Sequence, residues 1–174
     1  NSTSATFGGA AYLVHGPMTS GDLDTQAAAT FYGTNASDYA GLALVNAGDM
    51  DGDGLDDFSI SSYRADPIDP ISMCAVDAAG IVYVFTSTVS GVTALEDADM
   101  EVYGDVFFAY VGHDLFKAGD VNGDGLSDLL VGARARPTNG SAFLVSGDNA
   151  LPSELWLQDA TARMDGNTYQ AEFG

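Results

Sequence analysis

The segment DMDGDGLDD at residues 49–57 decides how this chain folds, and a close copy, DVNGDGLSD, occupies residues 120–128. Both segments place oxygen-bearing side chains at positions 1, 3, 5 and 9, and glycine at position 6, where a loop around an ion must turn sharply. Carboxylates crowded in this way repel one another unless a cation offsets their charge. Hard oxygen ligands at this density suit Ca²⁺. The sequence therefore predicts two calcium-binding loops.

Each loop is expected to supply four side chains and one main-chain carbonyl to its ion. The predicted ligands of the first ion are Asp49, Asp51, Asp53, the Leu55 carbonyl and Asp57. Those of the second ion are Asp120, Asn122, Asp124, the Leu126 carbonyl and Asp128. The alternative is a turn rich in aspartate and glycine that binds nothing, and the recurrence of the pattern in the same local context argues against it.

The loops begin like an EF-hand but differ from one at the end. An EF-hand requires a bidentate glutamate at position 12 and a helix after it. Position 12 is Ile60 in the first loop and Val131 in the second, and both lie in short runs typical of strands. We therefore expect each loop to join strand to strand, with Asp57 and Asp128 closing the sites.

The loops belong to a longer repeat. They lie 120 − 49 = 71 residues apart, and segments that begin at Phe31, Val102 and Met164 align at spacings of 71 and 62. The nine-residue difference indicates an insertion at residues 64–79 of the first copy. About four short strands per copy at this period are typical of a propeller blade. The predicted fold is all-β, made of four-stranded antiparallel β-propeller blades.

The repeat divides the chain into about two full blades with a partial blade on each side. Residues 1–32 supply the third and fourth strands of a preceding blade, and residues 167–174 begin a further one. The full blades are residues 33–103, which include the insertion, and residues 104–166. Residues 95–100 are expected to form an acidic outer strand that discourages edge-to-edge pairing.

Several short motifs resemble those of a known family, the FG-GAP repeat. Tyr39-Ala40-Gly41 and Ala47-Gly48-Asp49 precede the first loop, Val131-Gly132-Ala133-Arg134 follows the second, and Phe173-Gly174 supplies the Phe-Gly pair. FG-GAP repeats build the β-propeller of integrin alpha subunits and of many secreted bacterial proteins. The resemblance implies a propeller that carries calcium loops on one face.

The length suggests that these blades are not alone. A closed propeller contains roughly 4–8 blades, whereas 174 residues hold about two at this period. We expect further blades of a parent chain, or adjacent copies of this chain, to cover the exposed faces of the blades. The two alternatives are a segment of a larger protein and a short protomer completed by its neighbours.

Composition favours an extracellular or cell-surface setting for a secreted protein. The net charge is −20, with only five lysines and arginines, so nucleic acid and anionic membrane surfaces would repel the chain. A hydrophobic fraction of 46% excludes simple disorder, and no apolar run approaches the ~20 residues of a membrane span.

Four further residues mark the face opposite the calcium loops. Asn1, Asn35 and Asn139 each begin an Asn-x-Ser/Thr sequon and are candidate glycosylation sites. The single cysteine, Cys74, lies in the insertion. It is either a small buried residue or a thiol that bonds to another chain. This face is also where we expect a protein or glycan ligand.

Signals for catalysis are poor. No nucleophile elbow or phosphate-binding loop occurs, and we assign the many carboxylates to the two loops or to an acidic surface. The function expected is a non-enzymatic extracellular calcium-binding module for adhesion or structural assembly. Two alternatives remain: the propeller portion of a secreted enzyme or lectin that acts on polysaccharide, and the subunit of an extracellular filament.

Overall fold

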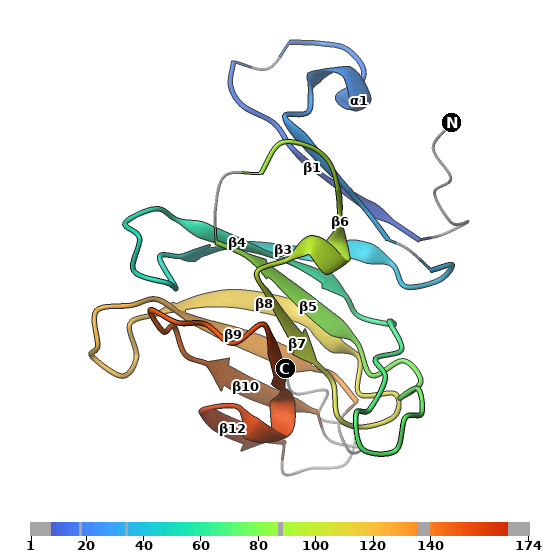
Figure 1. Cartoon of the computed structure of the whole chain (residues 1–174), viewed down its shortest axis with the longest axis vertical. Helices are drawn as coiled ribbons and strands as arrows, with labels where there is room; N and C mark the ends of the chain where they lie inside the picture. Colours follow the sequence, from blue (N-terminus) through green and yellow to red (C-terminus); the bar gives the residue numbers. More distant parts are fainter. Residues whose placement is uncertain (1–7, 18, 34, 87–88, 136–139, 167–174) are drawn as a thin grey trace.

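A computed structural model describes residues 8–166 of the chain, except residues 18, 34, 87–88 and 136–139. The described part is almost entirely strand and turn, which confirms the all-β prediction (Figure 1). Its helical pieces are short: α1 (Leu23–Gln26) and two 3-10 turns, η1 (Leu95–Asp97) and η2 (Leu157–Asp159). Within these residues no helix has the length and apolar character needed to cross a membrane.

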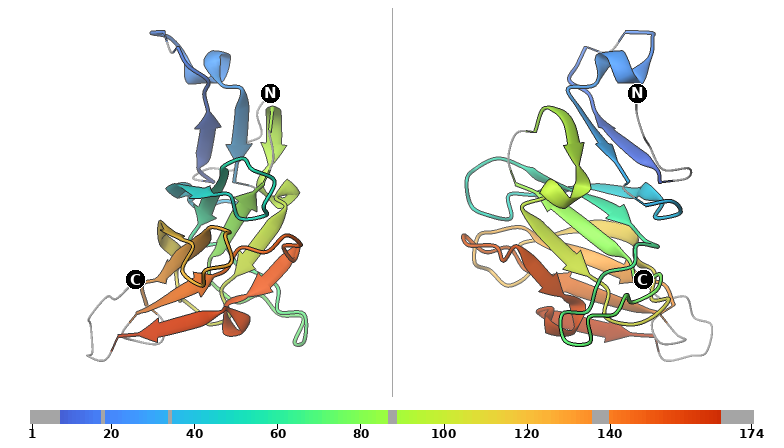
Figure 2. Two further views of the ribbon diagram at one scale, coloured as in Figure 1. Left: turned by 90° about the vertical axis from the view of Figure 1, so that its left-hand side faces the viewer. Right: turned by 45° about the vertical axis from the view of Figure 1, so that its right-hand side comes forward.

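The strands form three sheets that follow one another through the molecule, as two further views also show (Figure 2). The first sheet contains β1 (Ala10–Leu13), β2 (Ala29–Tyr32) and β6 (Gly91–Ala94). The middle sheet contains β3 (Ala40–Gly48), β4 (Asp57–Ser62), β5 (Ile81–Phe85), β7 (Met100–Tyr103) and β11 (Glu154–Trp156). The third sheet contains β8 (Val111–Gly119), β9 (Asp128–Ala133), β10 (Ser141–Val145) and β12 (Ala162–Asp165). The described residues do not close into a ring.

The middle and third sheets repeat each other in detail. The register of β3 on β4 shifts between Ala40 and Leu44 and again between Asn46 and Gly48. The register of β8 on β9 shifts at the positions 71 residues later, which are Val111, Leu115, Lys117 and Gly119. The sequence repeat is therefore also a repeat of strand irregularities, which set the direction in which each loop leaves its sheet.

The sheets differ from the prediction at their outer edges. The middle sheet has five strands, because β11 joins β7 in parallel, and β6 joins β2 of the first sheet in the same way. The expectation of purely antiparallel four-stranded sheets was therefore wrong for the middle sheet. Residues 95–100 do not form an acidic outer strand either, since η1 occupies residues 95–97 and β7 begins at Met100. A strand that crosses to the preceding sheet forms hydrogen bonds with backbone N–H and C=O groups of that sheet's edge strand, which would otherwise be unpaired.

Two apolar layers hold the sheets together. The larger lies between the middle and third sheets and includes Met50, Val82, Leu129 and Phe143, all fully buried. The smaller lies between the first and middle sheets and includes Phe31. Each sheet thus buries its apolar faces against the neighbouring sheets, as in other repeat proteins.

The joint between successive sheets is the same at both places. The Ala40 N–H donates to the Gly8 carbonyl at 2.8 Å, and the Val111 N–H donates to the Ala79 carbonyl at 2.8 Å. Gly80 must be glycine here, because its φ is +91° and an added Cβ would lie 2.3 Å from the Val111 carbonyl oxygen.

Candidate metal centre

The first loop joins β3 to β4, and its own acidic side chains hold its backbone. The Asp49 carboxylate accepts hydrogen bonds from the N–H groups of Gly52 at 2.7 Å and Gly54 at 3.1 Å. The Asp51 carboxylate accepts one from the Asp53 N–H at 3.0 Å. These bonds curl the chain around its carboxylates, and the glycines, which have positive φ, permit the turn.

The second loop, between β8 and β9, repeats this pattern position by position. Asp120 accepts hydrogen bonds from the N–H groups of Gly123 at 2.6 Å and Gly125 at 2.9 Å. Asn122 accepts one from the Asp124 N–H at 2.9 Å. Both loops therefore join strand to strand without a following helix, as predicted, and share one backbone conformation.

Three carboxylates converge in the first loop. One oxygen from each of Asp49, Asp51 and Asp57 lies within 4.8 Å of the others. Two ligands of one Ca²⁺ ion, each at about 2.4 Å, lie at most about 4.8 Å apart. The spacing of these oxygens is therefore compatible with binding to one Ca²⁺ ion.

Asp57 closes this group from the buried side. Its Oδ2 accepts a hydrogen bond from the Met50 N–H at 2.7 Å, while its Oδ1 is buried and has no hydrogen-bond partner among the described residues. Burial raises the pKa of Asp57 to about 6; the Met50 N–H lowers it, and the nearby charges of Asp51, Asp53 and Asp49 raise it further. A buried acceptor beside like charges is costly when unpaired, and a bound cation would satisfy the oxygen and reverse the effect of those charges. The residues present fit calcium.

The other two predicted ligands of the first ion lie on the outer side of the loop. Asp53 is exposed, and its Oδ1 accepts a hydrogen bond from the Leu55 N–H at 2.7 Å. It does not belong to the converging group. The side chain of Leu55 is exposed, so only its main chain is suited to the predicted role.

The second loop brings its carboxylates together less closely. Among the described residues, Asp120, Asp124 and Asp128 do not form a group of the kind found in the first loop. The Asn122 amide nitrogen donates to Asp124 Oδ2 at 2.8 Å, and Asp124 Oδ1 accepts from the Leu126 N–H at 2.8 Å. Asp124 is thus turned toward its neighbours in the loop.

Asp128 is buried like Asp57, but both of its oxygens have partners. Oδ2 accepts a hydrogen bond from the Val121 N–H at 2.8 Å, and Oδ1 accepts one from the Gly147 N–H at 3.1 Å. The orphaned oxygen is therefore particular to the first loop.

The first loop also contacts the second loop and the segment after β10. The Ser127 N–H donates to the Asp49 carbonyl at 2.7 Å, and the Asp148 N–H donates to the Met50 carbonyl at 2.9 Å. The Met50 side chain is 0% exposed, whereas Val121, its counterpart in the second loop, is 59% exposed. The first loop is thus part of the contact between two sheets, a role that sequence reasoning missed.

The remaining predicted site residues are not brought together. Asn35 is exposed, and Asn1 and Asn139 lie outside the described residues. Cys74 is exposed in the insertion, so the alternative of a small buried cysteine was wrong.

The assignment of every carboxylate to the loops or the surface was also wrong. Asp38 is only 7% exposed, and it lines a cavity with Glu101 and Tyr83. No sequence motif marks these residues, because they come from separate elements.

Comparisons with known proteins agree with the repeat. A family model for the FG-GAP repeat matches residues 118–145, which hold the second loop, β9 and β10. Integrin alpha-4 of Xenopus laevis is 30% identical to this chain over 117 residues, which are 66% of the chain and 10% of that protein. The match thus spans about a tenth of this relative's length.

Proposed function

Because this chain is an FG-GAP repeat protein of the integrin alpha type, we propose that it is a non-enzymatic, extracellular calcium-binding module of β-propeller blades that serves adhesion or structural assembly. The observation that carries the calcium proposal is the first loop. Three carboxylates converge there within calcium-ligand spacing, and a buried oxygen of Asp57 has no partner in the part of the chain that the structure describes.

The first ion would be held by Asp49, Asp51 and Asp57, with Asp53 and the Leu55 carbonyl completing the shell from the exposed side. The second would be held by Asp120, Asn122, Asp124, the Leu126 carbonyl and Asp128. In the second loop Asp124 must turn from Asn122 toward the ion, and its exposed position leaves it room to do so. When bound, calcium supplies positive charge that offsets the crowded carboxylates.

Calcium would act on the assembly of blades rather than on a substrate. It would fix the first loop, whose Asp49 carbonyl accepts a hydrogen bond from the second loop and whose Met50 carbonyl accepts one from the segment after β10. An ion that binds only the folded loop stabilises the fold by mass action. The metal would therefore hold successive blades in register.

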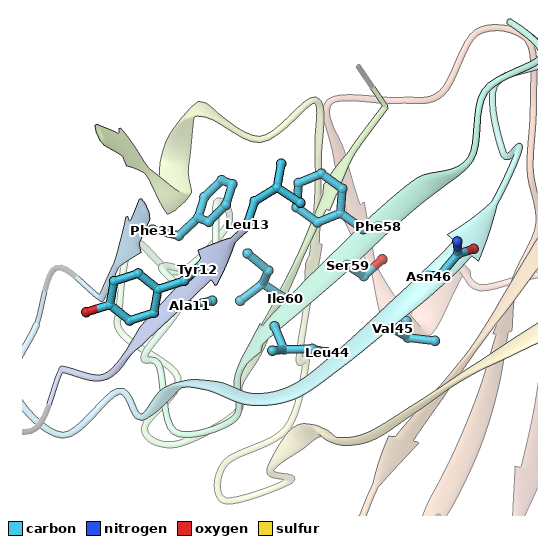
Figure 3. A pocket seen from close by; sticks show the side chains of 10 residues that line it. All are labelled: Ala11, Tyr12, Leu13, Phe31, Leu44, Val45, Asn46, Phe58, Ser59 and Ile60. Carbon is cyan, nitrogen blue, oxygen red and sulfur yellow. The ribbon is translucent and has the colours of Figure 1, made fainter. Parts of the chain in front are cut away.

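The blades have faces that suit further blades. A cavity of about 380 Å³ lies between β1 of the first sheet and β3 and β4 of the middle sheet (Figure 3). Phe31, Phe58 and Leu44 line it, and the Phe31 and Phe58 ring centroids lie 5.7 Å apart. Leu44 is 57% exposed, whereas Leu115, its counterpart in β8, is 7% exposed beneath the middle sheet. We propose that two further strands pair with β1 and cover this cavity.

The extracellular part of the proposal is supported by the likeness to integrin alpha-4 and by the charge of −20. In this setting the exposed Asn35 could be glycosylated and Cys74 could bond to another chain. Adhesion would use a protein or glycan ligand on the face opposite the calcium loops.

Isothermal titration of calcium into the chelator-treated full chain tests the proposal. We expect two ions per chain, and one fewer in Asp57→Asn, which keeps the acceptor for the Met50 N–H but removes the charge. Asp56→Asn is the matched control, because Asp56 is the adjacent exposed carboxylate and binds the Asn46 side chain at 2.8 Å. Absence of saturable calcium binding, or equal loss in both variants, would contradict the proposal.

A further inference from the structure

A second acidic site lies away from the calcium loops. A cavity of about 530 Å³ opens beneath the 64–79 insertion and is lined by the carboxylates of Asp38, Asp66, Glu96, Glu101 and Glu154 together with Tyr83 and Tyr103. These residues come from the β2–β3 loop, the insertion, β5, η1, β7 and β11. The volume is within the range of small-ligand pockets.

Asp38 and Glu101 are the least exposed carboxylates of this cavity. Among the described residues, no lysine, arginine or histidine lines it. Burial raises the pKa of Asp38, and it raises the pKa of Glu101, where the charges of Glu96 and Glu154 add to the effect. Several carboxylates in a partly desolvated space therefore repel one another.

The second observation is Tyr83. Its side chain is 4% exposed, and within the described part of the chain its hydroxyl has no hydrogen-bond partner. Burial raises its pKa, and so do the charges of Glu101, Glu96 and Asp38, which places the hydroxyl among these carboxylates. Tyr103 differs, because its hydroxyl donates to Glu101 Oε2 at 2.8 Å. The Tyr83 hydroxyl is not among the fully buried oxygens that lack a partner, so it reaches the space of the cavity and offers a hydrogen-bonding group to a ligand there.

The arrangement of the carboxylates identifies the kind of cation. In the described residues the set that converges to metal-ligand spacing is Asp49, Asp51 and Asp57, and none of the cavity carboxylates belongs to such a set. Carboxylates spread around a space of this size match a cation with several separated N–H donors. The aromatic and apolar side chains among them, such as Tyr83 and Ile81, suit the stem and flat face of such a group.

We propose that this cavity binds an organic cation, a guanidinium or alkylammonium group, through Asp38 and Glu101 with the Tyr83 hydroxyl as a further partner. The group could come from a free diamine-like compound or from an arginine or lysine side chain of a partner. The chemistry is the same for both sources. The insertion that roofs the cavity is absent from the second copy of the repeat, so the site is particular to the first blade.

The test is calorimetric titration of agmatine, which carries a guanidinium and an ammonium group, into the full chain in saturating calcium and low salt. We expect saturable one-to-one binding that Glu101→Gln weakens at least about tenfold, as for loss of one desolvated charge contact. Tyr83→Phe, which removes only the hydroxyl, should weaken it by a smaller factor. Asp159→Asn removes an exposed carboxylate of η2 outside the cavity and should leave binding unchanged.

Circular dichroism establishes whether each variant is folded. If Glu101→Gln does not fold, Tyr83→Phe still tests the proposal. A blocked Gly-Arg-Gly peptide distinguishes the sources: binding of agmatine alone supports a free small cation, and binding of both supports a side chain. No saturable binding of either probe would overturn the proposal. So would equal weakening by Asp159→Asn and Glu101→Gln, because it would mean general attraction to an acidic surface. Calcium binding is measured separately, so either failure leaves the calcium proposal intact.

Discussion

The two acidic loops provide an internal comparison of the same residue position with and without a following sheet among the described residues. Met50 and Val121 both occupy position 2 of their loops, and the N–H of each donates to the aspartate at position 9. Met50 is fully buried between the middle and third sheets, and Val121 is exposed. Truncation of each side chain to alanine keeps the backbone bond and removes only the packing.

The structure sets the expected sizes of the two effects. Met50→Ala removes buried atoms from a filled layer that includes Leu129 and Val145, so it should cost about 2–5 kcal/mol of the free energy of unfolding. Val121→Ala removes atoms that are already in water, so it should cost less than about 0.5 kcal/mol.

Urea unfolding of both variants in excess calcium, followed by far-ultraviolet circular dichroism, measures the two costs. The midpoint should fall for Met50→Ala with little change in the dependence on urea, because the same surface is exposed on unfolding. Equal costs for the two variants, or a cost below about 0.5 kcal/mol for Met50→Ala, would refute the inference that the first loop is part of the contact between sheets.

Two further predictions concern charge and association. Since the folded pKa of Asp57 is raised to about 6, the calcium-free protein should lose stability as pH rises from about 4 through about 6. In urea titrations the Asp57→Asn variant should lack this part of the pH dependence. A wild-type chain that gains stability relative to the variant over this range would contradict the prediction. The exposed apolar face around Leu44 should make the isolated chain self-associate, and light scattering would detect this. Leu44→Asp should reduce the association more than Ile71→Asp, which changes a residue of the exposed insertion. A wild-type chain that stays monomeric at high concentration would count against uncovered blade faces.

The sequence was most informative where structure is local. The position of each acidic loop, the strand on either side of it and the absence of an EF-hand helix follow from a nine-residue pattern and from Ile60 and Val131 at position 12. In the first loop the hydrogen bonds from backbone N–H groups to the carboxylates also run between residues at most seven apart, as from Met50 to Asp57.

The features that the sequence did not predict depend on distant residues. The parallel pairing of Glu154 with Glu101 joins residues 53 apart. A local sequence pattern does not predict which sheet edge a short strand will join. The cavity beneath the insertion likewise gathers carboxylates such as Asp38 and Glu154 from opposite parts of the sequence. Met50 is buried and Val121 is exposed because, within the described residues, only the first loop is followed by another sheet. Two nearly identical motifs do not predict this difference.

Thermal unfolding with and without calcium tests the central claim most directly. An ion at a hundred times its dissociation constant stabilises a fold by about 2.7 kcal/mol per site, and each kcal/mol shifts the melting temperature of a chain of this size by about 2–4 °C. We predict that chelation lowers the melting temperature by several degrees. The double variant Asp53→Asn with Asp124→Asn, which neutralises exposed position 5 in both loops, should lose most of this response. Equal melting temperatures for the wild-type chain in calcium and in chelator would contradict the account.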